Sequence, residues 1–112
     1  DYPLWLAPEQ VRLLPVTDEV QPYAESLLDL LTQAGVRATI DRSGDRLGKL
    51  IRTGEQMKIP VLAVIGAKEA EQNAVSLRSR RDGDLGVVAV ADLLRAAQNA
   101  NSQRAAGLEL NA

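Results

Sequence analysis

The residues best suited to chemistry follow a short apolar run, where Gly66-Ala-Lys-Glu69 precedes an arginine at position 78. The Glu69 carboxylate can accept two hydrogen bonds from the N–H donors of an unpaired guanine. The planar fork of Arg78 suits base acceptors. Basic side chains that could hold phosphates nearby are Lys49, Arg52, Lys58 and Arg80. The alternative interpretation is an ordinary surface ion pair of Glu69 with Lys68 or Arg78.

Catalytic constellations are missing from the sequence. The chain has no cysteine and no histidine, which excludes thiolate zinc sites and nucleophile–histidine triads. The Gly66 segment lacks the spacing of a phosphate-binding P-loop. Asp41 and Asp45 could form a metal pair, but their arginine neighbours at 42 and 46 are more typical of a salt-bridged loop. We therefore expect the chain itself to be non-catalytic and without a cofactor of its own.

Charge is unevenly distributed along the 112 residues, although the net charge is only −2. Between Arg37 and Arg81 there are ten Lys or Arg against five Asp or Glu, whereas the rest has three against ten. A basic middle indicates a local anionic partner, and a solvated mixture of charges is the alternative. No apolar run approaches the ~20 residues of a membrane span, so we expect no membrane partner.

The hydrophobic pattern predicts a single α/β domain. Continuous or alternating apolar runs predict strands at 11–17, 36–40, 61–65, 74–80 and 85–90. Apolar residues at helical spacing predict helices at 18–34, 46–57 and 91–100. This order predicts a three-layer sandwich, with a five-stranded mixed sheet flanked by three helices and its first three strands parallel. We expect the domain to cover residues 1–98 and residues 99–112 to be a frayed tail.

The topology and the charge pattern select the same edge of the sheet. Ligands of parallel sheets bind outside the carboxyl ends of the strands, which here lead into 41–46 and 66–69. Both segments belong to the basic middle. The polar side of the predicted helix 46–57 adds Arg46, Lys49 and Arg52. Because the chain lacks an initiator methionine, we expect it to be a fragment of a longer protein or a processed product.

Several motifs in order resemble the C-terminal anticodon-binding domain of threonyl-tRNA synthetases, which are class II aminoacyl-tRNA synthetases. They are Trp5-Leu-Ala-Pro-Glu-Gln-Val-Arg-Leu-Leu-Pro-Val-Thr-Asp18, Ala34-Gly-Val-Arg37, Leu47-Gly-Lys-Leu-Ile-Arg52, Lys58-Ile-Pro60, Gly66-Ala-Lys-Glu69 and Leu77-Arg-Ser-Arg-Arg-Asp-Gly-Asp-Leu-Gly86. The resemblance covers about residues 2–97. It implies a fold of five mixed strands and three helices.

The resemblance also implies a function and a site. The parent would be a cytoplasmic, homodimeric threonine–tRNA ligase, with ATP and zinc bound in a catalytic domain outside this chain. The chain, expected to be monomeric, would bind the anticodon loop of threonine tRNA. Family positions matching Glu69 and Arg78 contact anticodon bases, and those matching Arg52, Lys58, Lys68 and Arg80 lie on or near that surface. All threonine anticodons share guanine and uracil at their second and third places, which such a domain could read.

The sequence departs from the family pattern at three places. Gly44 stands where an Asn is usual, Lys58 where an Arg is frequent, and Ala67 where an Asp is common. Relaxed reading of the anticodon is one consequence. Two other hypotheses are a paralogous domain acting in protein interaction or regulation, and a small-ligand domain using the same sheet edge.

Overall fold

The computed structural model, which describes residues 3–110, has five strands and four α-helices, which alternate except that two strands follow each other before the last helix. The strands are β1 (Val11–Pro15), β2 (Ala38–Ile40), β3 (Val61–Ile65), β4 (Ala74–Ser79) and β5 (Gly83–Ala89). The helices are α1 (Gln21–Gln33), α2 (Leu47–Gln56), α3 (Ala67–Glu71) and α4 (Val90–Gln103), with 3-10 turns η1 (Leu4–Leu6) and η2 (Asp18–Val20). Among the described residues, no helix is long and apolar enough to cross a membrane.

The sheet has the strand order β2-β1-β3-β4-β5. The first three strands are parallel, with Leu13 of β1 opposite Ala63 of β3, and β4 and β5 then run antiparallel. This confirms the predicted mixed sheet. Because β4 reverses direction, its first residues lie beside the carboxyl ends of the parallel strands and its last residues lie beside their amino ends.

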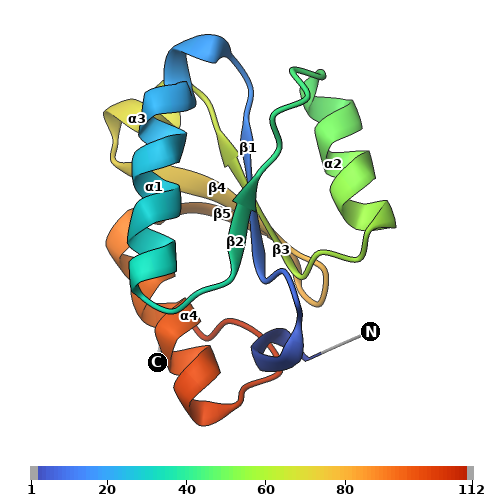
Figure 1. Cartoon of the computed structure of the whole chain (residues 1–112), viewed down its shortest axis with the longest axis vertical. Helices are drawn as coiled ribbons and strands as arrows, with labels where there is room; N and C mark the ends of the chain where they lie inside the picture. Colours follow the sequence, from blue (N-terminus) through green and yellow to red (C-terminus); the bar gives the residue numbers. More distant parts are fainter. Residues whose placement is uncertain (1–2, 111–112) are drawn as a thin grey trace.

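Two apolar layers bury the central strands on both faces. Leu13, fully buried, packs in the larger cluster with residues of α1 and α4, whereas the adjacent Leu14 packs in a smaller cluster with Leu50, Ile59 and Leu62. Successive residues of a strand point to opposite faces, so β1 supplies both layers. Figure 1 shows α1 and α4 on one side of the sheet and α2 on the other. Since α2 is the one helix on its side, it leaves β4 and β5 less covered there.

A buried amide ties three distant segments together. Gln10 is 1% exposed, and its Nε2 donates to the Leu4 carbonyl at 2.8 Å and to Asn101 Oδ1 at 2.5 Å. Its Oε1 accepts the backbone N–H of Arg37 at 3.0 Å. The side chain thereby joins the N-terminal turn, the entry to β2 and the end of α4. Glutamine is rarely this buried unless its polar atoms are all satisfied.

The structure differs from the predicted elements at three places. Residues 67–71 form the short helix α3 instead of a turn, and Leu4–Leu6 form a 3-10 turn instead of an extended segment. Helix α4 continues to Gln103, and beyond it Leu108 is buried against the larger apolar cluster. The expected fraying is not seen at Ala100 and Leu108, which pack against the apolar core, whereas residues 102–104 and Glu109 are exposed. The domain boundary at residue 98 stays a prediction.

Two glycines of α2 give a matched pair for stability. A Cβ on Gly54 would meet Leu62 Cδ2 at 2.6 Å, whereas a Cβ on Gly48 would meet nothing within 4 Å. We expect Gly54→Ala to lower the free energy of unfolding by about 1–3 kcal/mol, because Leu62 is buried and must move. Gly48→Ala should raise it by about 0.5–1 kcal/mol through helix propensity.

Urea unfolding of both variants checks this expectation. A stabilised Gly54→Ala variant would show that α2 shifts on the sheet without loss of packing.

Candidate nucleic-acid interface

The Glu69 carboxylate is held at the sheet edge from two sides. Gly66 N–H donates to Oε1 at 2.7 Å, and Ser76 Oγ donates to Oε2 at 3.1 Å. Gly66 is the N-cap of α3, and Glu69 occupies the third helical position, from which a glutamate reaches back to the cap N–H. The carboxylate is fixed by these two bonds rather than by a surface ion pair with Lys68. It is half-buried and keeps acceptor capacity on both oxygens.

Tyr23 lies close enough to the Glu69 carboxylate to be influenced by its negative charge. The Tyr23 hydroxyl donates to the Ala74 carbonyl at 2.8 Å, which ties the first turn of α1 to the start of β4. Burial raises the pKa of Tyr23, and the negative charge of Glu69 raises this pKa further. The start of β4, and with it Ser76, is thus positioned by α1.

Ser76 and Arg78 of β4 lie on the α2 side of the sheet, with Val87 of β5 opposite Ser76. We call these three residues the open face, because Val87 is 61% exposed and Ser76 and Arg78 are half-buried. Arg78 also lines a cavity of about 390 Å³ beside Leu62 and the end of α2. The predicted alternation of β4 is confirmed, since Val75 and Leu77 are fully buried on the other face. Ser76 was missed by sequence reasoning; its spacing of two from Arg78 was the available signal.

The other predicted site residues divide between the two edges of the sheet. Arg46, Lys49 and Lys68 lie at the carboxyl-end edge with Glu69; Arg52 lies midway along α2. Lys49 is 3.7 Å from Asp45 in an exposed ion pair. Lys58 and Arg80 lie at the opposite edge, since β4 ends beside the start of β3. The structure thus brings Glu69 and Arg78 onto one side of the sheet but spreads the cations along α2 and over both edges.

The loop before α2 has a defined shape. Gly44 has a φ of 75°, and Ser43 and Asp45 N–H groups donate to Asp41 Oδ1 and Ser43 Oγ. Arg42 pairs with Glu25 of α1. Nowhere in residues 3–110 do three or more His, Cys, Asp or Glu gather in a group that could hold a metal ion. The loop is therefore organised by local hydrogen bonds and by two ion pairs, Arg42 with Glu25 and Asp45 with Lys49.

Comparison with known proteins gives relatives for most of this chain. A family profile described as an anticodon binding domain matches residues 10–100. A protein of Synechococcus sp. (strain WH7803) named Threonine--tRNA ligase is 99% identical over 111 residues, which is 99% of this chain but 18% of that protein. A Threonine--tRNA ligase of Synechocystis sp. is 55% identical over 88% of the chain and 16% of its own length. The chain therefore spans less than a fifth of these relatives.

Solved structures share the fold. The RNA binding domain of threonyl-tRNA synthetase from Cryptosporidium parvum Iowa II superposes with a TM-score of 0.81 at 25% identity, over 96% of this chain and 26% of that one. Histidyl-tRNA synthetase from Nostoc sp. PCC 7120 gives 0.74 at 30% identity, over 80% of this chain and 21% of that one. These matches confirm both the resemblance seen in the sequence and the predicted fold class.

Substitutions at Glu69 separate its helix-capping role from its charge. Glu69→Ala removes the acceptor for Gly66 N–H and should lower the free energy of unfolding by about 1 kcal/mol. Glu69→Gln keeps a side-chain carbonyl oxygen that can still accept the Gly66 N–H. It should lower the free energy of unfolding by less than half as much as Glu69→Ala. Glu71→Ala, an exposed site on the same helix, is the control.

The urea midpoints of the three variants and the unmodified chain are compared, provided that the m-value is unchanged, so that a shift in midpoint reports a change in stability. Equal loss for the Ala and Gln variants would mean that the charge, not the bond to Gly66, stabilises α3.

Proposed function

This chain belongs to the family of anticodon-binding domains, and on that premise we propose that it binds the anticodon loop of threonine tRNA as one module of a threonine–tRNA ligase. In this proposal the parent is a homodimeric, ATP-dependent ligase of the cytoplasm. Its catalytic domain, with the ATP and zinc sites, lies outside this chain, which binds RNA as a monomeric unit. The observation that carries the proposal is the Glu69 carboxylate, fixed at the edge of the sheet by Gly66 and Ser76.

Glu69 would read guanine at the second anticodon place. The two neighbouring donors of guanine, N1–H and N2–H, match the two oxygens of one carboxylate, and adenine lacks this pair. Each oxygen already accepts one hydrogen bond and has a second lone pair available. Because the carboxylate is already positioned, little side-chain entropy is lost on binding.

Arg78 would read the uracil at the third place. Its guanidinium donors suit a uracil carbonyl oxygen, and its cavity beside Leu62 gives a splayed base an apolar wall. Single-stranded bases are read in this way, by stacking and by hydrogen bonds to their edges. The open face would therefore accept the two anticodon bases that all threonine tRNAs share.

The remaining predicted residues would hold the RNA backbone. Arg46, Lys49, Arg52 and Lys68 occupy α2 and the carboxyl-end edge, and Lys58 and Arg80 would contact phosphates farther along the RNA. Contacts to phosphates position an RNA without reading its sequence. We assign these six cations to affinity and Glu69 and Arg78 to specificity.

A titration with anticodon stem-loops tests the proposal. The unmodified chain should bind a threonine loop more tightly than a loop with adenine at the second place, by about 1–3 kcal/mol. Glu69→Gln keeps one acceptor and should remove most of this difference, while it retains the fold.

Fluorescence anisotropy at fixed salt measures both affinities. Equal binding of the two loops by the unmodified chain would contradict base reading by Glu69. Absence of binding to either loop would favour the paralogous domain of protein interaction or regulation.

Gly44 provides a test of relaxed reading. Its φ of 75° and the open space around it accommodate an asparagine, which tolerates left-handed backbone better than most residues. We expect Gly44→Asn to tighten binding of the threonine loop by about 0.5–1.5 kcal/mol, the net value of one hydrogen bond.

Gly44→Ala is the matched control, since alanine adds no polar group and is strained at this φ. A gain for Asn on the adenine loop as large as on the threonine loop would indicate loop stiffening rather than base reading.

A further inference from the structure

A second cavity, of about 270 Å³, lies at the edge of the sheet opposite Glu69. Four separate segments enclose it: the N-terminal turn, the loop before β3, the β4–β5 turn and residues 106–108. Leu4, Val61 and Leu108, all at least nine-tenths buried, provide its apolar wall. The Leu4 N–H donates to the Ala106 carbonyl at 3.0 Å, so the two end segments of the described chain are joined beside the cavity.

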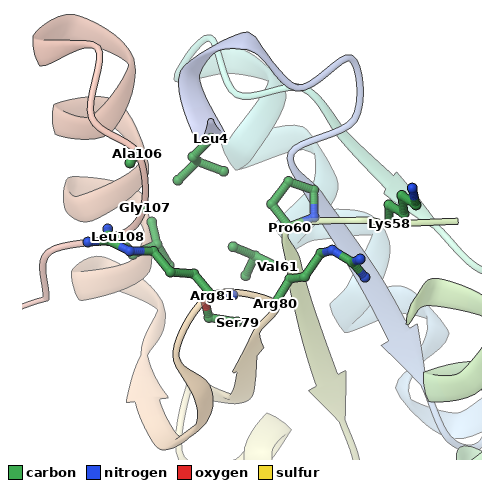
Figure 2. A pocket seen from close by; sticks show the side chains of 10 residues that line it. All are labelled: Leu4, Lys58, Pro60, Val61, Ser79, Arg80, Arg81, Ala106, Gly107 and Leu108. Atoms are coloured by element: carbon green, nitrogen blue, oxygen red, sulfur yellow. The ribbon is translucent and has the colours of Figure 1, made fainter. Parts of the chain in front are cut away.

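Three cations surround this apolar wall. Lys58, Arg80 and Arg81 line the cavity, and none of its lining residues within 3–110 is acidic. In Figure 2 the Arg81 side chain extends toward Gly107 and Leu108, whereas Arg80 points the other way, and its Nη1 donates to the Glu55 carbonyl at 3.2 Å. The ideal Cβ position of Gly107 is 2.9 Å from Arg81 Nη1, so the guanidinium passes close over a residue without a side chain. Positive charge thus lies on both sides of a largely apolar cavity, and Asp82 Oδ1 lies 4.0 Å from Arg81 Nε in an exposed ion pair.

The backbone of Lys58 is a second, independent observation. The N–H groups of Lys58 and Ile59 donate to the Glu55 and Gly54 carbonyls at 3.0 and 3.1 Å, which closes α2 in the manner of a Schellman motif. Lys58 stands at the left-handed position of that motif, with a φ of 60°, where glycine is favoured. A lysine in this conformation departs from the usual glycine, and its side chain lines the cavity.

From this combination we infer that the cavity binds a small organic anion, with an apolar body against Leu4, Val61 and Leu108 and a carboxylate or phosphate group beside Arg81, while Lys58 and Arg80 add positive charge from the opposite side. A phosphodiester of RNA would reach the cations but leave the apolar wall uncovered. The volume is close to the lower end of the range for ligand sites, about 300–1,000 Å³, which fits a single-ring compound. The site lies at the other edge of the sheet from Glu69 and goes beyond the proposed function, although it shares Lys58 and Arg80 with the proposed RNA surface.

Nuclear magnetic resonance titration of the ¹⁵N-labelled chain tests the site. The probes are phenyl phosphate, benzoate, inorganic phosphate and the neutral benzyl alcohol. We expect phenyl phosphate and benzoate to shift the amide signals of residues 79–81 and 106–108. Inorganic phosphate and benzyl alcohol should each bind about tenfold more weakly, because each lacks one half of the interaction. The ratio of the phenyl phosphate and benzoate affinities identifies which anionic group the cations prefer.

Three variants locate the site, and two of them, Arg81→Gln and Gly107→Ala, change residues that have no part in the proposed RNA surface. Arg81→Gln should weaken binding of phenyl phosphate about tenfold, and Gly107→Ala should weaken it by displacing the guanidinium. Lys58→Gly should weaken binding while relieving the backbone, so a loss there is not a loss of fold. Arg42→Gln, at the other edge of the sheet, is the control and should change nothing.

Three results would overturn the inference. Equal affinity for inorganic phosphate and phenyl phosphate would show that the apolar wall does not contribute and that only surface charge binds the anion. Equal affinity for benzyl alcohol and benzoate would show that the cations do not contribute to binding. Amide shifts that do not include residues 79–81 or 106–108, for any of the four probes, would exclude binding in this cavity.

Discussion

Burial of β1 and β3 on both faces is the constraint on which the rest of the structure depends. Leu13 and Leu14 point to opposite layers, and β3 is apolar from Val61 to Ile65. Two covered faces exclude polar side chains from the middle of the sheet, because a buried polar group costs free energy without a partner. Polar chemistry is therefore confined to the two ends of these strands and to the less covered half made by β4 and β5.

That constraint produces two regions of different character. At the carboxyl ends, a helix cap and a strand hydroxyl hold one carboxylate next to Ser76 of the open face. At the amino ends, the segments near both ends of the described chain converge and enclose an apolar hollow with a basic rim. Antiparallel β4 connects the two regions, because Ser76 lies toward the first and Arg80 follows its end in the second. One short strand and the turn after it thus supply a residue to each region, Ser76 to the first and Arg80 to the second.

Most of the fold could be predicted from the sequence, and less of the candidate site. Val61–Ile65 has the unbroken apolar run of a strand covered on both faces, and the alternation through Val75 and Leu77 showed which side of β4 is open. Helix α3 was missed because five residues cannot show a helical period. The bond of Ser76 to Glu69 joins residues on two elements, so no local pattern reports it. The left-handed backbone of Lys58 was equally hidden, since this conformation is typical of glycine.

The buried Gln10 has a consequence for how the domain opens. One amide holds the N-terminal turn, the entry to β2 and the end of α4, and Leu4 is bonded in turn to Ala106. Regions of a protein that share their stabilising contacts open together as a cooperative unit. The two ends of the described chain therefore form one such unit, although about a hundred residues separate them along the sequence. Force or proteolysis that releases either end exposes the other, and the hollow between them is lost in the same event.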